Sequence, residues 1–111
     1  MVDELGDSRC ATKSDAEAIA TQYLDAMCVK DGRLIGDLAV DKELIEEFDI
    51  GWVFYWSTAR YWQTGAMEDA IAGNAPLLIR RGTGEVIALG TGRPTIYYVD
   101  WIRRHGEASW R

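Results

Sequence analysis

The sequence predicts an α+β domain, in which an N-terminal helix packs on an antiparallel sheet of about four strands and a short C-terminal helix follows. Three patterns predict this arrangement. They are a helical apolar stripe over residues 14–29, an alternating aromatic run over residues 44–57, and two apolar segments separated by glycines over residues 77–89. A chain of 111 residues is long enough for one domain with a single hydrophobic core.

Residues 14–29 have the spacing of an amphipathic helix. Three large apolar side chains recur at intervals of four residues and are expected to face the core: Ile19, Tyr23 and Met27. Ser14 and Glu17 stand three residues apart, as in a capping box, so Ser14 is expected to begin the helix. Asp31 and Gly32 then supply a stop.

Residues 44–57 are expected to form one long strand or a bent pair of strands. Side chains of one parity are all large and apolar and are expected to pack under the N-terminal helix: Phe48, Ile50, Trp52, Phe54 and Trp56. Gly51 interrupts this run, at a position where a bulge or a close approach of a second backbone is expected. Trp52, Phe54 and Trp56 are therefore interpreted as core residues that maintain the fold.

Three further elements follow this central strand. They are expected in the order of a helical turn over 59–63 closed by Gly65, a hairpin of 77–81 and 85–89 joined by Gly82–Gly84, and a helix over 96–105 that stops at Gly106. We expect a single domain over residues 14–106. A loose tail over residues 1–13, which contains Cys10, would precede it, and a short tail over residues 107–111 would follow.

The net charge of −6 is unevenly distributed along the chain. Residues 1–50 hold 13 acids and 5 bases, whereas residues 51–111 hold 5 acids and 7 bases. This balance disfavours binding to nucleic acid and suits a protein partner with a basic surface, although the acids are equally explained as a solvated face that keeps the chain soluble. The N-terminus lacks the features of a signal peptide and no apolar run is long enough to cross a membrane, so a cytoplasmic location is expected.

The sequence carries no recognisable catalytic, metal or cofactor motif. Cys10 and Cys28 are too few for a zinc site or a disulfide scaffold. His105 stands beside two arginines without an identifiable nucleophile. We therefore expect no enzymatic activity and no cofactor. A small hydrolase or ligand-binding domain that uses Glu47, Asp49 or His105 is the alternative.

Two sets of residues are candidates for contact with a partner. The first is a loop after the central strand in which an arginine precedes two aromatic side chains: Arg60, Tyr61 and Trp62. The second is the densest acidic cluster: Glu46, Glu47 and Asp49. Such a cluster is more often the solvated side of a sheet, and that interpretation stays open.

Five segments carry a family resemblance through their order and spacing: Gly51–Ser57, Tyr61–Gly65, Gly73–Pro76, Thr83–Val86 and Gly90–Pro94. Together they resemble the YrhB-type domain, also called immunity protein 35. In that family a Gly-Trp-aromatic strand, a Gly-Asn-x-Pro element, a short hairpin and a Gly-Thr segment precede a helix with tyrosines, here Tyr97 and Tyr98. The resemblance covers residues 14–106.

The resemblance implies a small α+β protein without enzymatic activity that protects a bacterial cell by binding a cognate protein toxin. It also implies that the recurrent tryptophan and the positions of Gly73, Asn74 and Pro76 maintain the fold. Toxin-binding surfaces vary among immunity proteins, so no binding residue is carried over. We expect a monomer or a homodimer. A chaperone-like role has been attributed to a member of the group, and a holdase that binds unfolded chains through an aromatic patch is the alternative function.

Overall fold

The computed structural model describes residues 10–27, 29–30, 33–34, 38–65 and 75–109. The elements, in chain order, are helix α2 (Lys13–Met27), strands β2 (Val29–Lys30), β3 (Arg33–Leu34), β4 (Leu38–Phe48) and β5 (Gly51–Thr58), helix α3 (Ala59–Thr64), strands β6 (Leu77–Arg80) and β7 (Val86–Ala88), and helix α4 (Thr95–His105). Strands β4, β5, β6 and β7 form one antiparallel sheet in that order, and β2 pairs with β3 separately. The predicted α+β class, with an N-terminal helix, a four-stranded sheet and a short C-terminal helix, is confirmed.

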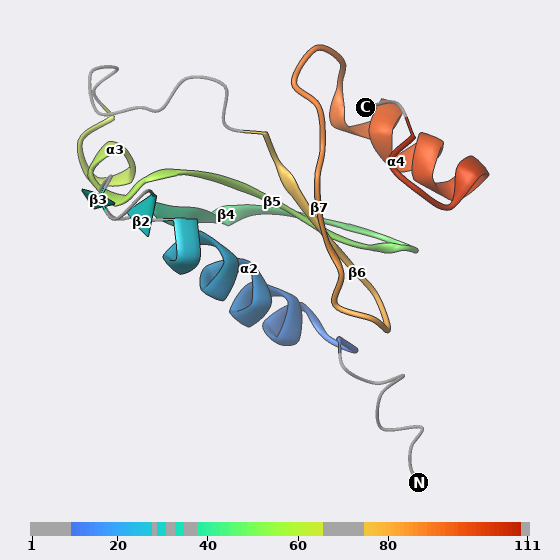
Figure 1. Ribbon diagram of the computed structural model, residues 1–111, viewed down its shortest axis with the longest axis horizontal. Coiled ribbons are helices and arrows are strands. Elements are labelled where there is room, and N and C mark those ends of the chain that lie inside the picture. The colour runs from blue at the N-terminus through green and yellow to red at the C-terminus, as the bar shows by residue number, and fades with distance from the viewer. Residues whose placement is uncertain (1–9, 28, 31–32, 35–37, 66–74, 110–111) are drawn as a thin grey trace, which may run out of the picture.

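The sheet is covered by helices on both faces (Figure 1). Helix α2 lies along one face, over a core that includes Trp52, Phe54, Trp56, Leu77 and Ile79. Helix α4 lies against the opposite face, over a second core that includes Val53, Leu78, Ile87, Tyr98, Val99 and Ile102. Strand β5 is one of the two inner strands and contributes alternate side chains to both cores.

Helix α2 begins one residue before the predicted start and is capped by a different pair of residues. The Thr12 hydroxyl accepts the backbone N–H of Asp15 at 3.1 Å. The Asp15 carboxylate in turn accepts the N–H groups of Ala11 at 3.1 Å and Thr12 at 3.2 Å. These hydrogen bonds, that from Ala11 above all, hold the pKa of Asp15 below its usual range. The predicted box of Ser14 and Glu17 is wrong, because Thr12 and Asp15 have the same spacing two residues earlier and make the capping hydrogen bonds.

The buried stripe of α2 is centred on small residues. Ala16 and Ala20 are fully buried and Leu24 is 1% exposed, whereas Ile19 and Met27 pack along the margin of the core. Tyr23, predicted to face the core, is 38% exposed. The alanines allow the helix backbone to approach the large aromatic side chains of the sheet, so the bulk at this interface comes from the sheet.

The predicted aromatic run is divided by a two-residue turn at Asp49 and Ile50, so β4 and β5 form a tight hairpin in which Phe48 pairs with Gly51. Phe48 and Ile50 consequently pack with the α4-facing core, and their predicted place under α2 is wrong. The alternation of side chains between the two faces of a sheet holds within one strand, and it does not carry across a turn into the next strand. The close approach predicted at Gly51 is confirmed, since its φ is 153° and a Cβ there would lie 2.1 Å from the Ile79 carbonyl oxygen.

Cys10 is held by the body of the domain. Its side chain is fully buried in the α2-facing core, and its carbonyl oxygen accepts the N–H of Gly82 at 2.8 Å. Burial raises the pKa of its thiol. The expectation that Cys10 lies in a loose tail is wrong, because the chain just before α2 is fixed to the turn between β6 and β7.

The later elements agree with their predicted order. The helical turn α3 is capped by Thr58 and closed by Gly65, whose φ is 71°. Strands β6 and β7 form the predicted hairpin. Helix α4 ends at Gly106, whose N–H is donated to the Ile102 carbonyl at 2.6 Å.

Candidate functional site

The acidic cluster predicted on β4 is divided among separate partners within the chain. Glu46 accepts the phenol O–H of Tyr55 at 2.8 Å. The Tyr55 oxygen also lies 2.6 Å from the Thr95 hydroxyl at the start of α4, and because the single phenol proton goes to Glu46, Thr95 is the donor in that bond. Burial is the main cause that raises the pKa of Tyr55. Glu46 is therefore part of a chain of hydrogen bonds that joins β4, β5 and α4.

The other two acids of the cluster are paired with arginines. Glu47 lies 2.9 Å from Nη2 of Arg81, whose guanidinium also stacks 4.1 Å from the ring centroid of Trp52. Asp49 lies 2.6 Å from Nη2 of Arg103. Glu47 and Asp49 thus point to different cations and form neither a shared cation site nor an acid–base pair.

His105 does not complete a catalytic arrangement with these acids. It is exposed and its ring lies 4.4 Å from that of Trp101 on the same helix. Across the described parts of the chain, no group of three His, Cys, Asp or Glu side chains is placed to hold a metal ion. No helix within those parts has the length and apolar character that a membrane span requires.

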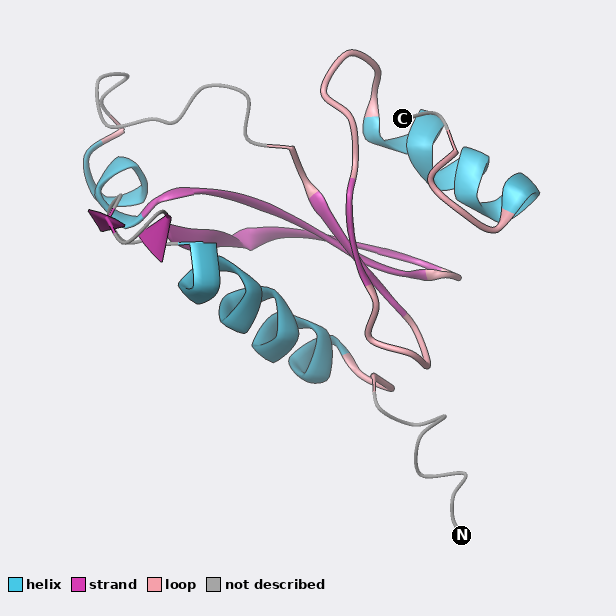
Figure 2. Ribbon diagram, viewed as in Figure 1, coloured by secondary structure: helices cyan, strands magenta, loops and turns pink. Residues whose placement is uncertain are grey.

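The second predicted set lies on α3. This helix stands on the side of the sheet opposite α2 (Figure 2). The indole N–H of Trp62 is donated to the Ala39 carbonyl of β4 at 2.8 Å, and the ring of Tyr61 meets the Trp62 ring edge-on at 5.1 Å. Trp62 is nevertheless 38% exposed. Its edge is anchored to the sheet while much of the ring remains open to solvent, an arrangement typical of an interface anchor.

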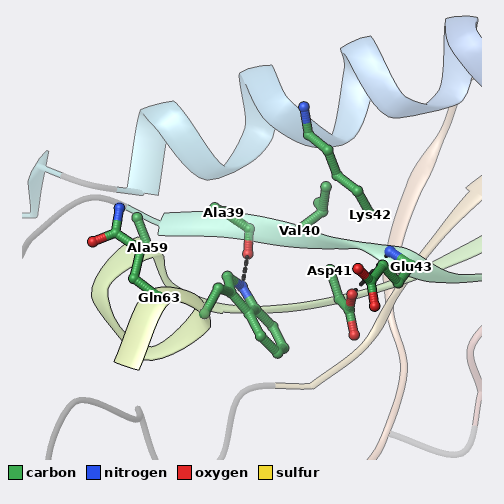
Figure 3. Close-up of a pocket in the computed structure, with 8 residues that line it drawn as sticks. Ala39, Val40, Asp41, Lys42, Glu43, Ala59 and Gln63 are labelled. Atoms are coloured by element: carbon green, nitrogen blue, oxygen red, sulfur yellow. Dashed lines mark hydrogen bonds between the residues drawn. The ribbon is translucent and has the colours of Figure 1, made fainter. Parts of the chain in front are cut away.

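A groove lies beside Trp62, between the β4 segment 39–43 and the α3 residues Ala59, Trp62 and Gln63. We call it the β4–α3 groove. It has a volume of about 460 Å³, within the range of ligand pockets, and it is open to solvent. Figure 3 shows Asp41 and Glu43 on one side of β4 and Lys42 extending towards α2 on the other. Lys42 lies 3.9 Å from Glu17 of α2.

The β4–α3 groove owes its acidic wall to an irregularity in the sheet. Val40 pairs with Trp56 and Ile45 pairs with Phe54, so the four residues from Asp41 to Leu44 lie opposite Tyr55 alone. The Asp41 carboxylate accepts the Glu43 N–H at 2.9 Å and stabilises this bulge. Neither Asp41 nor Glu43 was among the residues predicted from the sequence, and the local indication that could have marked them is the Asx-type spacing of the two residues.

Two of the residues that the resemblance assigns to the fold, Trp56 and Pro76, make hydrogen bonds between separate sequence motifs. Trp56 is 7% exposed and donates its indole N–H to the Ala75 carbonyl at 2.6 Å, and the Pro76 carbonyl accepts the Leu89 N–H at 2.8 Å. Gly73 and Asn74 lie outside the described residues. Trp56 therefore connects the aromatic strand to the entry of β6.

Comparison with known proteins places the chain among the relatives of one family. The model of the family described as immunity protein 35 matches residues 14–102. The uncharacterized protein YrhB of Escherichia coli (strain K12) is 35% identical over 88 residues, which cover 79% of this chain and 84% of YrhB. No solved structure matches. The matched region includes the whole four-stranded sheet, α3, all of α2 except its first residue, and most of α4.

Proposed function

The chain belongs to the immunity protein 35 family, and from that membership we propose that it is a non-catalytic immunity protein that binds a cognate bacterial toxin in the cytoplasm and neutralises it. The observation that carries the proposal is the family match over residues 14–102. Neutralisation of this kind is stoichiometric: the immunity protein covers a functional surface of the toxin for as long as the complex lasts. It needs a stable domain with a complementary surface and no catalytic group.

Two features of the domain support a binding role. Arg60, Tyr61 and Trp62 are presented on a short helix that is held to β4 by an indole hydrogen bond, so the surface is pre-organised. The net charge of −6 favours encounter with a basic protein, because complementary fields accelerate association. We accordingly propose a toxin with a basic contact surface.

The holdase alternative has less support from the positions of the aromatic side chains. A holdase would need an exposed aromatic patch, whereas Trp52 and Phe54 are at most 1% exposed and Trp56 is 7% exposed. The aromatic stretch that suggested a patch in the sequence therefore forms the core of the domain. Light scattering of an unrelated aggregating protein separates the two functions, because a holdase suppresses aggregation and a dedicated immunity protein does not.

Co-expression tests the proposed function directly. The large open reading frame next to the gene is expressed from an inducible promoter, alone and together with this chain, and surviving cells are counted. We expect the neighbouring product to kill cells alone, and this chain to restore growth and to co-purify with it in a fixed ratio. An unrelated acidic protein of similar size is the control for charge. A product that is harmless alone, or that kills equally in the presence of this chain, would overturn the proposal.

A further inference from the structure

The β4–α3 groove brings two carboxylates and an exposed indole together on one face of the sheet. Leu38 and Val40 point into the α2-facing core, so the alternate residue Ala39 faces the other way, towards α3. Asp41 and Glu43 lie on that side too, whereas Lys42 extends towards α2 (Figure 3). Lys42 is the basic residue of segment 39–43, and its ammonium group lies beside Glu17 of α2. It therefore does not neutralise the carboxylates of Asp41 and Glu43 in the groove.

The carboxylates of Asp41 and Glu43 have few partners among the described residues, unlike the other acids of β4 and its turn. Glu46, Glu47 and Asp49 each bind a donor elsewhere in the chain. Among the residues that the structure describes, by contrast, neither Asp41 nor Glu43 takes part in an ion pair. Within the described segments, the hydrogen bond that these carboxylates accept comes from a backbone N–H, that of Glu43 to Asp41. Most of their acceptor capacity remains open to a partner.

Trp62 supplies the third component in a fixed position. Because its N–H is already bound to the Ala39 carbonyl at 2.8 Å, the indole edge is satisfied and the ring plane is held in place. A further polar atom lies on the same face: Ser57 pairs with Ala39 in the sheet register, and its buried hydroxyl has no hydrogen-bond partner among the residues that the structure describes. Ser57 is 3% exposed and does not itself line the groove, whereas its strand partner Ala39 does.

We propose that the β4–α3 groove binds the guanidinium group of an arginine side chain presented by the partner protein. A guanidinium is planar and cationic, so it can stack on the Trp62 ring while its N–H groups bind carboxylate oxygens of Asp41 and Glu43. A lysine ammonium is more strongly hydrated and lacks both the flat face and the paired donors. An anion would be repelled by the same carboxylates. The identification of that partner as a toxin rests on the proposed function.

The proposal can be tested without the partner, by titrating the full-length chain with N-acetyl-arginine amide and following its indole and backbone N–H signals by NMR. N-acetyl-lysine amide and N-acetyl-citrulline amide are the comparison probes, since citrulline keeps the flat shape and loses the charge. We expect saturable shifts of the Trp62 indole signal, assigned from its loss in Trp62→Phe, and binding of the arginine probe at least threefold tighter than that of the lysine probe. Citrulline should leave the signal unchanged.

Two double variants complete the test. Asp41→Asn with Glu43→Gln keeps side-chain volume and the Asx hydrogen-bond acceptor, and it should weaken arginine binding at least tenfold. Asp25→Asn with Glu107→Gln removes the same number of charges at exposed positions outside the groove and should leave binding unchanged. Equal shifts with citrulline, shifts confined to other surfaces, or equal weakening by both variants would each overturn the proposal.

Failure of this inference is distinguishable from failure of the proposed function. If the wild-type chain protects cells and Asp41→Asn with Glu43→Gln protects them equally well, the groove is not the contact and the immunity function stands. If the arginine probe binds as expected but the wild-type chain gives no protection, the guanidinium site stands and the toxin assignment is lost.

Discussion

The carboxylate of Asp49, in the turn between β4 and β5, is bound to the guanidinium of Arg103 on α4, with Oδ1 lying 2.8 Å from Nε and 2.6 Å from Nη2. Arg103 also pairs with Asp100 on its own helix, and its guanidinium lies 5.8 Å from the ring centroid of Phe48. The turn is thereby fixed to the C-terminal helix. Asp49, a candidate for partner contact in the sequence, therefore also belongs to the contact that joins the β4–β5 turn to α4.

Asp49→Asn should lower stability in a pH-dependent way. The hydrogen bond from Arg103 is the main cause that lowers the pKa of Asp49 in the folded state. The folded state therefore binds this proton less readily than the unfolded state, and the stabilisation is complete above the unfolded pKa of about 3.9 and is lost as the pH falls through the lower folded value. Urea unfolding midpoints of the two proteins should differ at neutral pH and converge in acid. Asp25→Asn, at an exposed position on α2, is the control, and a pH-independent difference would contradict the expectation.

Gly51→Ala should be strongly destabilising. A Cβ at this position would lie 2.1 Å from the Ile79 carbonyl oxygen, and the φ of 153° is one that side chains rarely adopt. Overpacking of about 1–3 kcal/mol adds to backbone strain of about 1–3 kcal/mol, so we expect a loss of about 2–6 kcal/mol in the free energy of unfolding. Gly65→Ala is the matched control, because its φ is 71° but no atom lies within 4 Å, and it should cost only about 1–2 kcal/mol. Equal losses in the two variants would show that strand proximity is unimportant.

Trp56→Ala should cost about 3–5 kcal/mol in urea unfolding. The indole is almost fully buried under α2 and also holds the Ala75 carbonyl at 2.6 Å, so the change leaves a cavity and an unpaired acceptor. Trp56→Phe should recover part of the packing and none of the hydrogen bond. Its free energy of unfolding is therefore expected to lie between those of the wild type and Trp56→Ala. Near-wild-type stability of Trp56→Ala would mean that this face of β5 contributes little to the core.

Helices and strands whose side chains follow a single periodicity could be predicted from the sequence. Features whose geometry depends on contact with another segment of the chain could not. Residues 77–89 and 96–105 alternate or turn regularly and their elements were predicted correctly. The division of the aromatic run depends on a reversal at Asp49 and Ile50, which contain no glycine or proline to mark it. The cap of α2 was missed because two overlapping pairs fit the same spacing.

The candidate site likewise contains one residue that the local sequence indicates and others whose place depends on a second strand. Trp62 was identified because an aromatic pair after a strand is locally conspicuous. Asp41 and Glu43 were not, because their place beside α3 is set by the bulge that puts four residues of β4 opposite one residue of β5. A bulge is a property of two paired strands, and the sequence of one strand does not encode it. The partners of Glu46, Glu47 and Asp49 within the chain could not be predicted either, since the donors that bind them come from distant segments.

Trp62→Ala should separate binding from stability. Trp62 is 38% exposed, so its removal should cost less than the about 3–5 kcal/mol expected for a fully buried tryptophan, even with the hydrogen bond to the Ala39 carbonyl lost. Affinity for the toxin, measured by calorimetry once co-expression has identified it, should fall by about thirtyfold or more, because an anchored tryptophan in an interface contributes about 2 kcal/mol or more. Tyr23→Ala is the matched control, since Tyr23 is also an aromatic side chain with 38% exposure but lies on α2, across the sheet from α3. Comparable losses of affinity in both variants would contradict a toxin contact specific to α3. A loss confined to Tyr23→Ala would indicate that the toxin binds α2.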